Sequence, residues 1–153
     1  DEAITIFNVD TFRPGFRYPD DALVAAGDGF LETFSAPGER WSFVLPARDL
    51  PDASADTAVT LVARTAEKQR ISDLCSTGLY HFARAGDFRE ACRHAPPDHT
   101  GAAGQRERYV APLYNLLIQR GRKVHYTSVE GHEVIECGTP AAYESLVAQF
   151  AGG

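Results

Sequence analysis

The chain has 153 residues, of which 44% are hydrophobic and 24% charged, and this is enough apolar content to bury the core of one globular domain. Its net charge of -6 argues against a protein that holds nucleic acid by neutralising phosphates, because such binding needs an excess of Lys and Arg. No apolar run reaches the roughly 18 residues of a membrane-spanning helix, and no secretion signal opens the chain. We therefore predict one domain over residues 1–153, cytoplasmic, with no nucleic-acid or membrane partner.

The cysteines and the absence of Met further limit what kind of protein this chain can be. The cysteines Cys75, Cys92 and Cys137 form no CxxC pair and are odd in number, so neither a disulfide framework nor a zinc knuckle is predicted. The chain contains no Met and reaches an apolar strand within its first few residues. We therefore expect it to be part of a longer protein.

The first predicted element is a strand over residues 3–9. Its nearly continuous apolar and β-branched residues are typical of a strand that is buried on both faces of a parallel sheet. Asp10 follows at the carboxyl end of this strand, the edge at which open α/β sheets bind ligands. A short helix is expected over 20–26. Strands over 29–34 and 40–45 flank Ala36-Pro37-Gly38, a turn sequence that predicts a hairpin.

The rest of the chain continues this alternation of strands and helices. Strands are expected over 57–65 and 75–82, the second interrupted by Gly78, which within a strand often marks a close approach of ligand or backbone. Helices are expected over 87–93 and 107–120, and short strands over 123–129 and 134–135. Thr139 and Pro140 are a good cap and first residue for a last helix. The pattern predicts a three-layer α/β domain with a mixed, mainly parallel sheet.

Three segments place polar side chains at or beside these strands. Asp10 is suited to bind Mg²⁺, which prefers oxygen ligands, although Asp is also a common turn residue. Lys68 and Arg70 could hold a phosphate by charge, or could belong to a solvated connector. Glu136 ends a strand just before a helix N-terminus, where a metal or an anion is electrostatically favoured. Each segment alone has an ordinary structural explanation.

As an ordered set, however, the segments resemble the sugar-1-phosphate nucleotidyltransferase family, which includes the glucose-1-phosphate thymidylyl- and uridylyltransferases. The resemblance covers nearly the whole chain and rests on Asp10, the pair Glu67-Lys68, the strand Thr77-Gly78-Leu79-Tyr80, and Gly138-Thr139-Pro140. Two positions depart from the family pattern: Gln69 replaces a Pro, and Glu136 replaces a metal-binding Asp. Arg40-Trp41 and neighbouring residues are similar to a bacterial subgroup linked to surface polysaccharides.

The resemblance implies a Rossmann-like nucleotide-diphospho-sugar transferase fold without its N-terminal portion, which in the family carries a Gly-rich nucleotide-binding loop. It implies a reaction in which a sugar-1-phosphate and an NTP give an NDP-sugar and pyrophosphate with the help of Mg²⁺. The residue roles that it implies are catalysis by Lys68 and Asp10, substrate binding by Glu67, Lys68, Arg70, Thr77 and Gly78, and metal binding by Asp10 and Glu136.

Two other functions stay open from the sequence. The chain could be a non-catalytic module of this family that binds sugar phosphate or serves in assembly, and Gln69 and Glu136 favour that alternative. It could also be a nucleotide-sugar-dependent glycosyltransferase that uses Asn8-Val9-Asp10 as its metal motif. A homo-oligomer is compatible with each of these functions.

Overall fold

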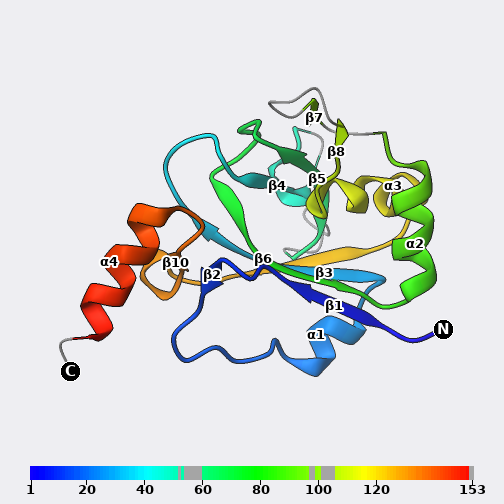
Figure 1. Cartoon of the computed structure of the whole chain (residues 1–153). Helices are drawn as coiled ribbons and strands as arrows, with labels where there is room; N and C mark the ends of the chain where they lie inside the picture. The colour runs from blue at the N-terminus through cyan, green and yellow to red at the C-terminus, as the bar shows by residue number, and fades with distance from the viewer. Residues whose placement is uncertain (52, 54–59, 97–98, 101–105, 152–153) are drawn as a thin grey trace.

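A computed structural model describes residues 1–51, 53, 60–96, 99–100 and 106–151 (Figure 1). Its main sheet has six strands: β1 (Ile4–Phe7), β3 (Gly29–Ser35), β4 (Ser42–Pro46), β5 (Val62–Glu67), β6 (Leu74–Phe82) and β9 (Val124–Ser128). The order is β5-β4-β6-β3-β9, and β1 also pairs with β6. The long strand β6 is central, with β3 along one edge and with β4 and β1 along the other.

The predicted α/β class with a mixed sheet is confirmed, but the sheet contains less parallel pairing than the sequence suggests. Among the pairings that the structure describes, only β3 with β9 is parallel, and the others are antiparallel. Parallel neighbours need a long crossover connection, usually an α-helix. No α-helix is found in the described residues between β3 and β6, and β4, β5 and β6 meet all their described neighbours in antiparallel directions.

The hairpin predicted for the strands on either side of Pro37-Gly38 is wrong. The chain does turn there, and Gly38 has a φ of +87°, but β6 lies between β3 and β4. Cys75 of β6 is paired with Phe34 on one side and with Phe43 on the other. Both strands run antiparallel to β6, so β3 and β4 point in the same direction and the chain bends at Pro37-Gly38 without reversing. Strand pairing was decided by a segment more than thirty positions further along the chain.

The first strand is also less buried than predicted. Ile4 and Ile6 pack against the main core, while Thr5 and Phe7 are exposed, with Phe7 at 41%. This alternation is that of a strand with one covered face. Its antiparallel register with β6, in which Ile6 is opposite Tyr80, brings the following residues, Asn8 to Asp10, beside the middle of β6.

Helices cover both faces of the sheet, which gives the three layers that the sequence predicts. On β3, Leu31 packs in the core with Tyr114 and Leu117 of α3 (Tyr114–Gln119) and with α2 (Ala85–His94). The neighbouring Phe30 packs instead against Val24 of α1 (Asp21–Ala25). Because successive side chains of a strand point to opposite faces, α1 lies on one face and the α2–α3 pair on the other.

The helix boundaries follow the predictions unevenly. Residue 107 belongs to β8 (Arg106–Glu107), which pairs with β7 (His99–Thr100), and the expected helix over 107–120 begins only with a 3-10 turn at Ala111–Leu113. The last helix, α4 (Pro140–Phe150), begins as predicted, with the Thr139 hydroxyl accepting from the Ala142 amide at 3.2 Å. No described helix has the length and apolar content needed to cross a membrane.

A second, smaller sheet lies beside the main one. It consists of β2 (Thr11–Phe12) and β10 (Ile135–Glu136), antiparallel, with Thr11 opposite Glu136 and Phe12 opposite Ile135. Figure 1 shows this pair between the main sheet and α4. Asp10 immediately precedes β2, so the small sheet brings together two acidic residues that the sequence singled out.

Candidate functional site

A cavity of about 330 Å³ lies where the small sheet faces the main sheet. The small sheet and the residues before it contribute Asn8, Asp10, Thr11 and Glu136, and the main sheet contributes Ser42, Glu67, Ser76, Thr77 and Tyr80. The remaining lining residues lie in connecting segments before β4, after β5 and after β8: Arg40, Trp41, Lys68, Arg108, Tyr109 and Val110. The cavity thus collects charged, hydroxyl and aromatic groups from segments far apart in the sequence.

Five of the seven residues predicted for the site line this one cavity: Asp10, Glu67, Lys68, Thr77 and Glu136. We expected Asp10, Lys68 and Glu136 in particular to converge on one pocket, and all three line this cavity. Their individual roles remain predictions. Arg70 and Gly78 are not among the described lining residues.

The two carboxylates are brought together by backbone pairing. Glu136 is opposite Thr11 in the small sheet, and the next amide, that of Cys137, donates to the Asp10 carbonyl at 2.8 Å. Glu136 also forms an ion pair with Arg40. A Cβ atom at Gly138 would lie 2.6 Å from the Asp10 Oδ2 atom, so the absence of a side chain at Gly138 leaves room for the Asp10 carboxylate.

The donor set at this edge of the cavity fits Mg²⁺ chemically. Mg²⁺ commonly binds through one or two carboxylates together with waters and substrate phosphates, and Asp10 and Glu136 supply two carboxylates. Within the described ranges, no three His, Cys, Asp or Glu side chains gather as a metal-binding group. A protein-only metal cage is therefore not formed by those residues, and oxygen atoms of substrate and water would complete the coordination.

Lys68 lines the same cavity and directly follows β5. Its φ of +51° lies in the left-handed region, which is unfavourable for a residue with a side chain. The backbone is held there by the Lys68 amide, which donates to the Trp41 carbonyl at 2.9 Å. The Lys68 ammonium donates to the Tyr109 hydroxyl at 2.7 Å, and its nitrogen lies 4.8 Å from the centre of the Tyr109 ring.

The floor of the cavity is made of buried polar side chains. Glu67 is only 7% exposed and accepts a hydrogen bond from the Ser42 hydroxyl. Thr77 is 2% exposed, and its hydroxyl donates to the Glu32 carboxylate at 2.9 Å. Burial raises the pKa of Tyr80, so its phenol remains protonated at neutral pH. These groups offer hydrogen bonds of fixed direction to a ligand rich in hydroxyl groups.

Gly78 has a structural explanation that does not involve a ligand. Leu31 is paired with Tyr80 and Thr33 with Ser76, so residues 77–79 form a bulge opposite a single residue of β3. Gly78 has a φ of +92°, and a Cβ atom there would lie 2.4 Å from the Asn8 side chain. The close approach expected for this glycine is therefore made by Asn8.

Arg70 lies away from the cavity, beside a shallow hollow next to the turn between β3 and β4. Its guanidinium donates to the carbonyls of Ala36 and Gly38, both at 2.8 Å, and stacks 4.9 Å from the Phe43 ring. This geometry braces the turn, and it does not bring Arg70 to the substrate position expected from the sequence.

Sequence reasoning gave no site role to two dipeptides that line the cavity, Arg40-Trp41 and Arg108-Tyr109. Each combines a cation with an aromatic ring, and the Arg40 guanidinium lies 4.7 Å from the Trp41 ring centre. A basic residue followed by an aromatic one, repeated in two connecting segments, was a signal for phosphate and ring contacts that could have been used.

The fold and this cavity can be compared with known proteins. No protein-family model and no curated protein sequence matches the chain. Among solved structures, the nucleoside-diphosphate-sugar pyrophosphorylase from Vibrio cholerae RC9 is 46% identical, with a TM-score of 0.78 over 96% of this chain and 56% of that one.

Two more distant structures share the fold. A glucose-1-phosphate thymidylyltransferase from Bacillus anthracis, in complex with a sucrose, is 16% identical with a TM-score of 0.60, over 97% of this chain and 54% of that one. The inositol-1-phosphate CTP transferase from T. maritima is 12% identical with a TM-score of 0.57, over the same shares of the two chains. This chain therefore spans a little over half the length of each of the three proteins. The resemblance to the sugar-1-phosphate nucleotidyltransferase family that the sequence motifs predict is confirmed by the 46% identical pyrophosphorylase, and the two more distant structures show the shared fold alone.

Proposed function

We propose that this chain forms the sugar-phosphate side of the active site of a nucleotidyltransferase that joins a sugar-1-phosphate to an NTP, giving an NDP-sugar and pyrophosphate. The observation that carries the proposal is the single cavity lined by Asp10, Glu136, Glu67, Lys68 and Thr77. It combines three carboxylates, an ammonium group and buried hydroxyl groups, which are the groups needed to hold a phosphorylated sugar beside a divalent cation.

In this reaction, an oxygen of the sugar-1-phosphate attacks the α-phosphorus of the NTP, and pyrophosphate leaves from the opposite side. Lys68 binds the sugar phosphate and keeps its attacking oxygen in line. Glu67, oriented by the Ser42 hydroxyl, accepts hydrogen bonds from sugar hydroxyls, and Thr77 borders the same ring. Asp10 and Glu136 would hold Mg²⁺, which would supply positive charge that offsets the negative charge of the phosphates.

The test uses the full-length protein and measures pyrophosphate release with a panel of NTPs and sugar-1-phosphates in the presence of Mg²⁺. Lys68→Ala should lower kcat/KM by about 100-fold, the size of effect expected when one charged donor to the reacting group is removed. The chain has a natural control, because Lys123 is its other lysine and is exposed outside the cavity. Lys123→Ala should retain wild-type kinetics, and equal kinetics for the two variants would remove Lys68 from the site.

The same panel separates the alternatives. Binding of a sugar-1-phosphate without pyrophosphate release from any pair would indicate a non-catalytic module. Release of a nucleoside diphosphate from a nucleotide-sugar, with transfer of the sugar, would indicate a glycosyltransferase. Removal of divalent cations with EDTA should abolish pyrophosphate release, and added Mg²⁺ should restore it.

A further inference from the structure

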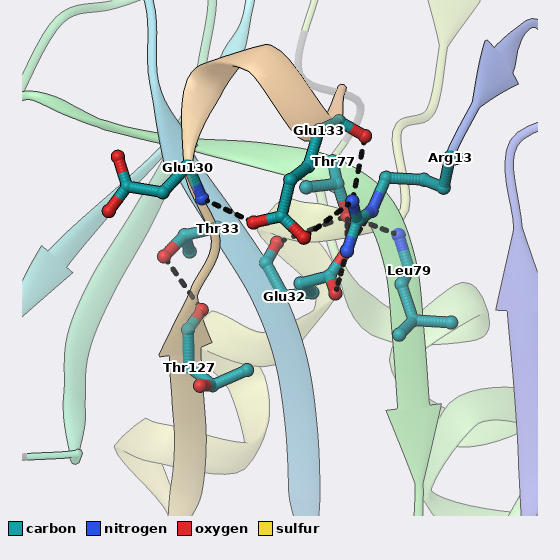
Figure 2. Close-up of polar contacts among 8 residues, drawn as sticks. All are labelled: Arg13, Glu32, Thr33, Thr77, Leu79, Thr127, Glu130 and Glu133. Atoms are coloured by element: carbon teal, nitrogen blue, oxygen red, sulfur yellow. Dashed lines mark hydrogen bonds and ion pairs between the residues drawn. The ribbon is translucent and has the colours of Figure 1, made fainter. Parts of the chain in front are cut away.

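A buried ion pair lies behind the cavity, between the two sheets. The Arg13 Nε and Nη2 atoms each donate to one carboxylate oxygen of Glu32, both at 3.0 Å (Figure 2). The two side chains are 4% and 3% exposed. This fork-to-fork geometry fixes the relative orientation of the two groups as well as their distance.

The Arg13 guanidinium also holds the second strand of the small sheet. Its Nη1 atom donates to the Glu133 carbonyl at 2.7 Å and lies 3.7 Å from the Glu133 carboxylate. That carboxylate in turn accepts from the Glu130 amide at 2.9 Å, which completes a capping box around the 3-10 turn Gly131–Glu133. Arg13 directly follows β2, and Glu133 lies two residues before β10, so one guanidinium contacts the backbone segments that carry both cavity carboxylates.

On the main-sheet side, Glu32 connects the pair to the cavity itself. The carboxylate oxygen of Glu32 that accepts from Arg13 Nε also accepts from the Thr77 hydroxyl at 2.9 Å. Thr77 lines the cavity from the bulge in β6, opposite Glu32. Figure 2 shows Arg13, Glu133, Glu32 and Thr77 in this one connected cluster.

We infer that Arg13 and Glu32 are positioning residues, which set the distance between the small sheet with Asp10 and Glu136 and the main sheet with Lys68 and Thr77. The inference rests on the proposed function. A buried ion pair adds little net stability compared with apolar side chains of similar size, but it can select one arrangement of the elements that it joins. The two sheets share no strand pairing in the described residues, so side-chain contacts such as this pair contribute to their separation, together with the short backbone connection from β1 to β2.

The test is the double variant Arg13→Met/Glu32→Leu of the full-length protein, which removes both charges together and leaves neither one buried alone. Its thermal unfolding midpoint should stay close to that of the wild type, since an apolar pair of similar volume can replace a buried ion pair without loss of stability. The value of kcat should fall by about tenfold or more, because a shift of even 1 Å between reacting groups can cost more than that.

The KM for the sugar-1-phosphate distinguishes positioning from a general loss of structure. It should change by less than about twofold, because Lys68 and Glu67 belong to the main sheet and stay in place relative to each other. The matched control is Arg120→Met/Glu90→Leu, an ion pair of 2.8 Å between α2 and the end of α3, which should retain both kinetic constants.

Failure of this inference can be distinguished from failure of the proposed function. A wild-type protein that releases no pyrophosphate contradicts the proposed function before any variant is made. If the wild type is active, a folded double variant with wild-type kcat overturns the positioning role. Failure of the double variant to fold also overturns it, because the pair then serves folding alone.

Discussion

The left-handed backbone at Lys68 allows one prediction to be worked out in sign and size. Lys68→Ala and Lys68→Gly both remove the ammonium group and its bond to Tyr109, so they differ only in the Cβ atom. At a φ of +51°, a Cβ atom lowers the free energy of unfolding by roughly 1–2 kcal/mol. Relative to alanine, glycine lowers the free energy of unfolding by roughly 0.4–1 kcal/mol, because it gives the unfolded chain more conformational freedom. The glycine variant should therefore be more stable than the alanine variant, by about 0.8 kcal/mol.

Urea unfolding monitored by circular dichroism measures this difference, which corresponds to about 2–3 °C in Tm for a chain of this length. Lys123 is the control, because no positive φ is found there and its side chain is exposed. At Lys123 the order should reverse, with alanine more stable than glycine by about 0.4–1 kcal/mol. If the alanine variant is more stable than the glycine variant at both positions, the strain argument is refuted. Both Lys68 variants should lose activity to the same degree, since both lack the ammonium group.

Three further predictions concern stability. Gly78→Ala should cost about 2 kcal/mol or more, measured by urea unfolding, because the new Cβ atom meets the Asn8 side chain at an unfavourable φ. Arg70→Ala should cost about 1 kcal/mol, because two carbonyl contacts of the turn are lost from a partly exposed site, and it should raise the sugar-phosphate KM less than Lys68→Ala does. Burial lowers the pKa of His81 and His125 below the ordinary 6.5, so the unfolded chain takes up more protons in acid. The free energy of unfolding should therefore fall as the pH drops below about 6.5, and less steeply for His81→Gln.

Local sequence signals predicted those elements that are decided locally. Thr139 and Pro140 start α4 because the Thr139 hydroxyl satisfies a free amide of its own first turn, and such a bond needs no distant partner. The strand expected over 75–82 differs from β6 by one residue, because its apolar and β-branched content suits any central strand.

Features decided by distant partners were not predictable in this way. Arg13 stands in a loop rich in Pro, Gly and Arg, and nothing near it indicates that its side chain is 4% exposed. Its burial depends on Glu32, which a sequence reader would assign to an ordinary strand position. The position of β6 between β3 and β4 has the same cause, since pairing is a property of whole strands. Five of the cavity residues were found because their motifs occur in order, whereas the residues that hold them in place carry no motif.

The charges around the cavity lead to a last prediction, about how metal and substrate depend on each other. The described lining residues include three acidic side chains, Asp10, Glu67 and Glu136, and three cationic ones, Arg40, Lys68 and Arg108, so their formal charges cancel. A sugar-1-phosphate brings roughly two negative charges at neutral pH, close to the value for a phosphorylated side chain. A divalent cation bound at the acidic edge would offset that excess.

By linkage, Mg²⁺ should then tighten sugar-phosphate binding by the same factor by which the sugar phosphate tightens Mg²⁺ binding. A coupling of about 1–3 kcal/mol, or roughly 5–150-fold, is typical of such reciprocal effects. Calorimetric titration of the sugar-1-phosphate with and without Mg²⁺ measures the factor, and the variant Asp10→Asn/Glu136→Gln provides the comparison. In that variant the gain from Mg²⁺ should disappear, because the acidic edge that attracts the cation is neutral. Equal sugar-phosphate affinities with and without Mg²⁺ in the wild type would contradict a shared site for the two ligands.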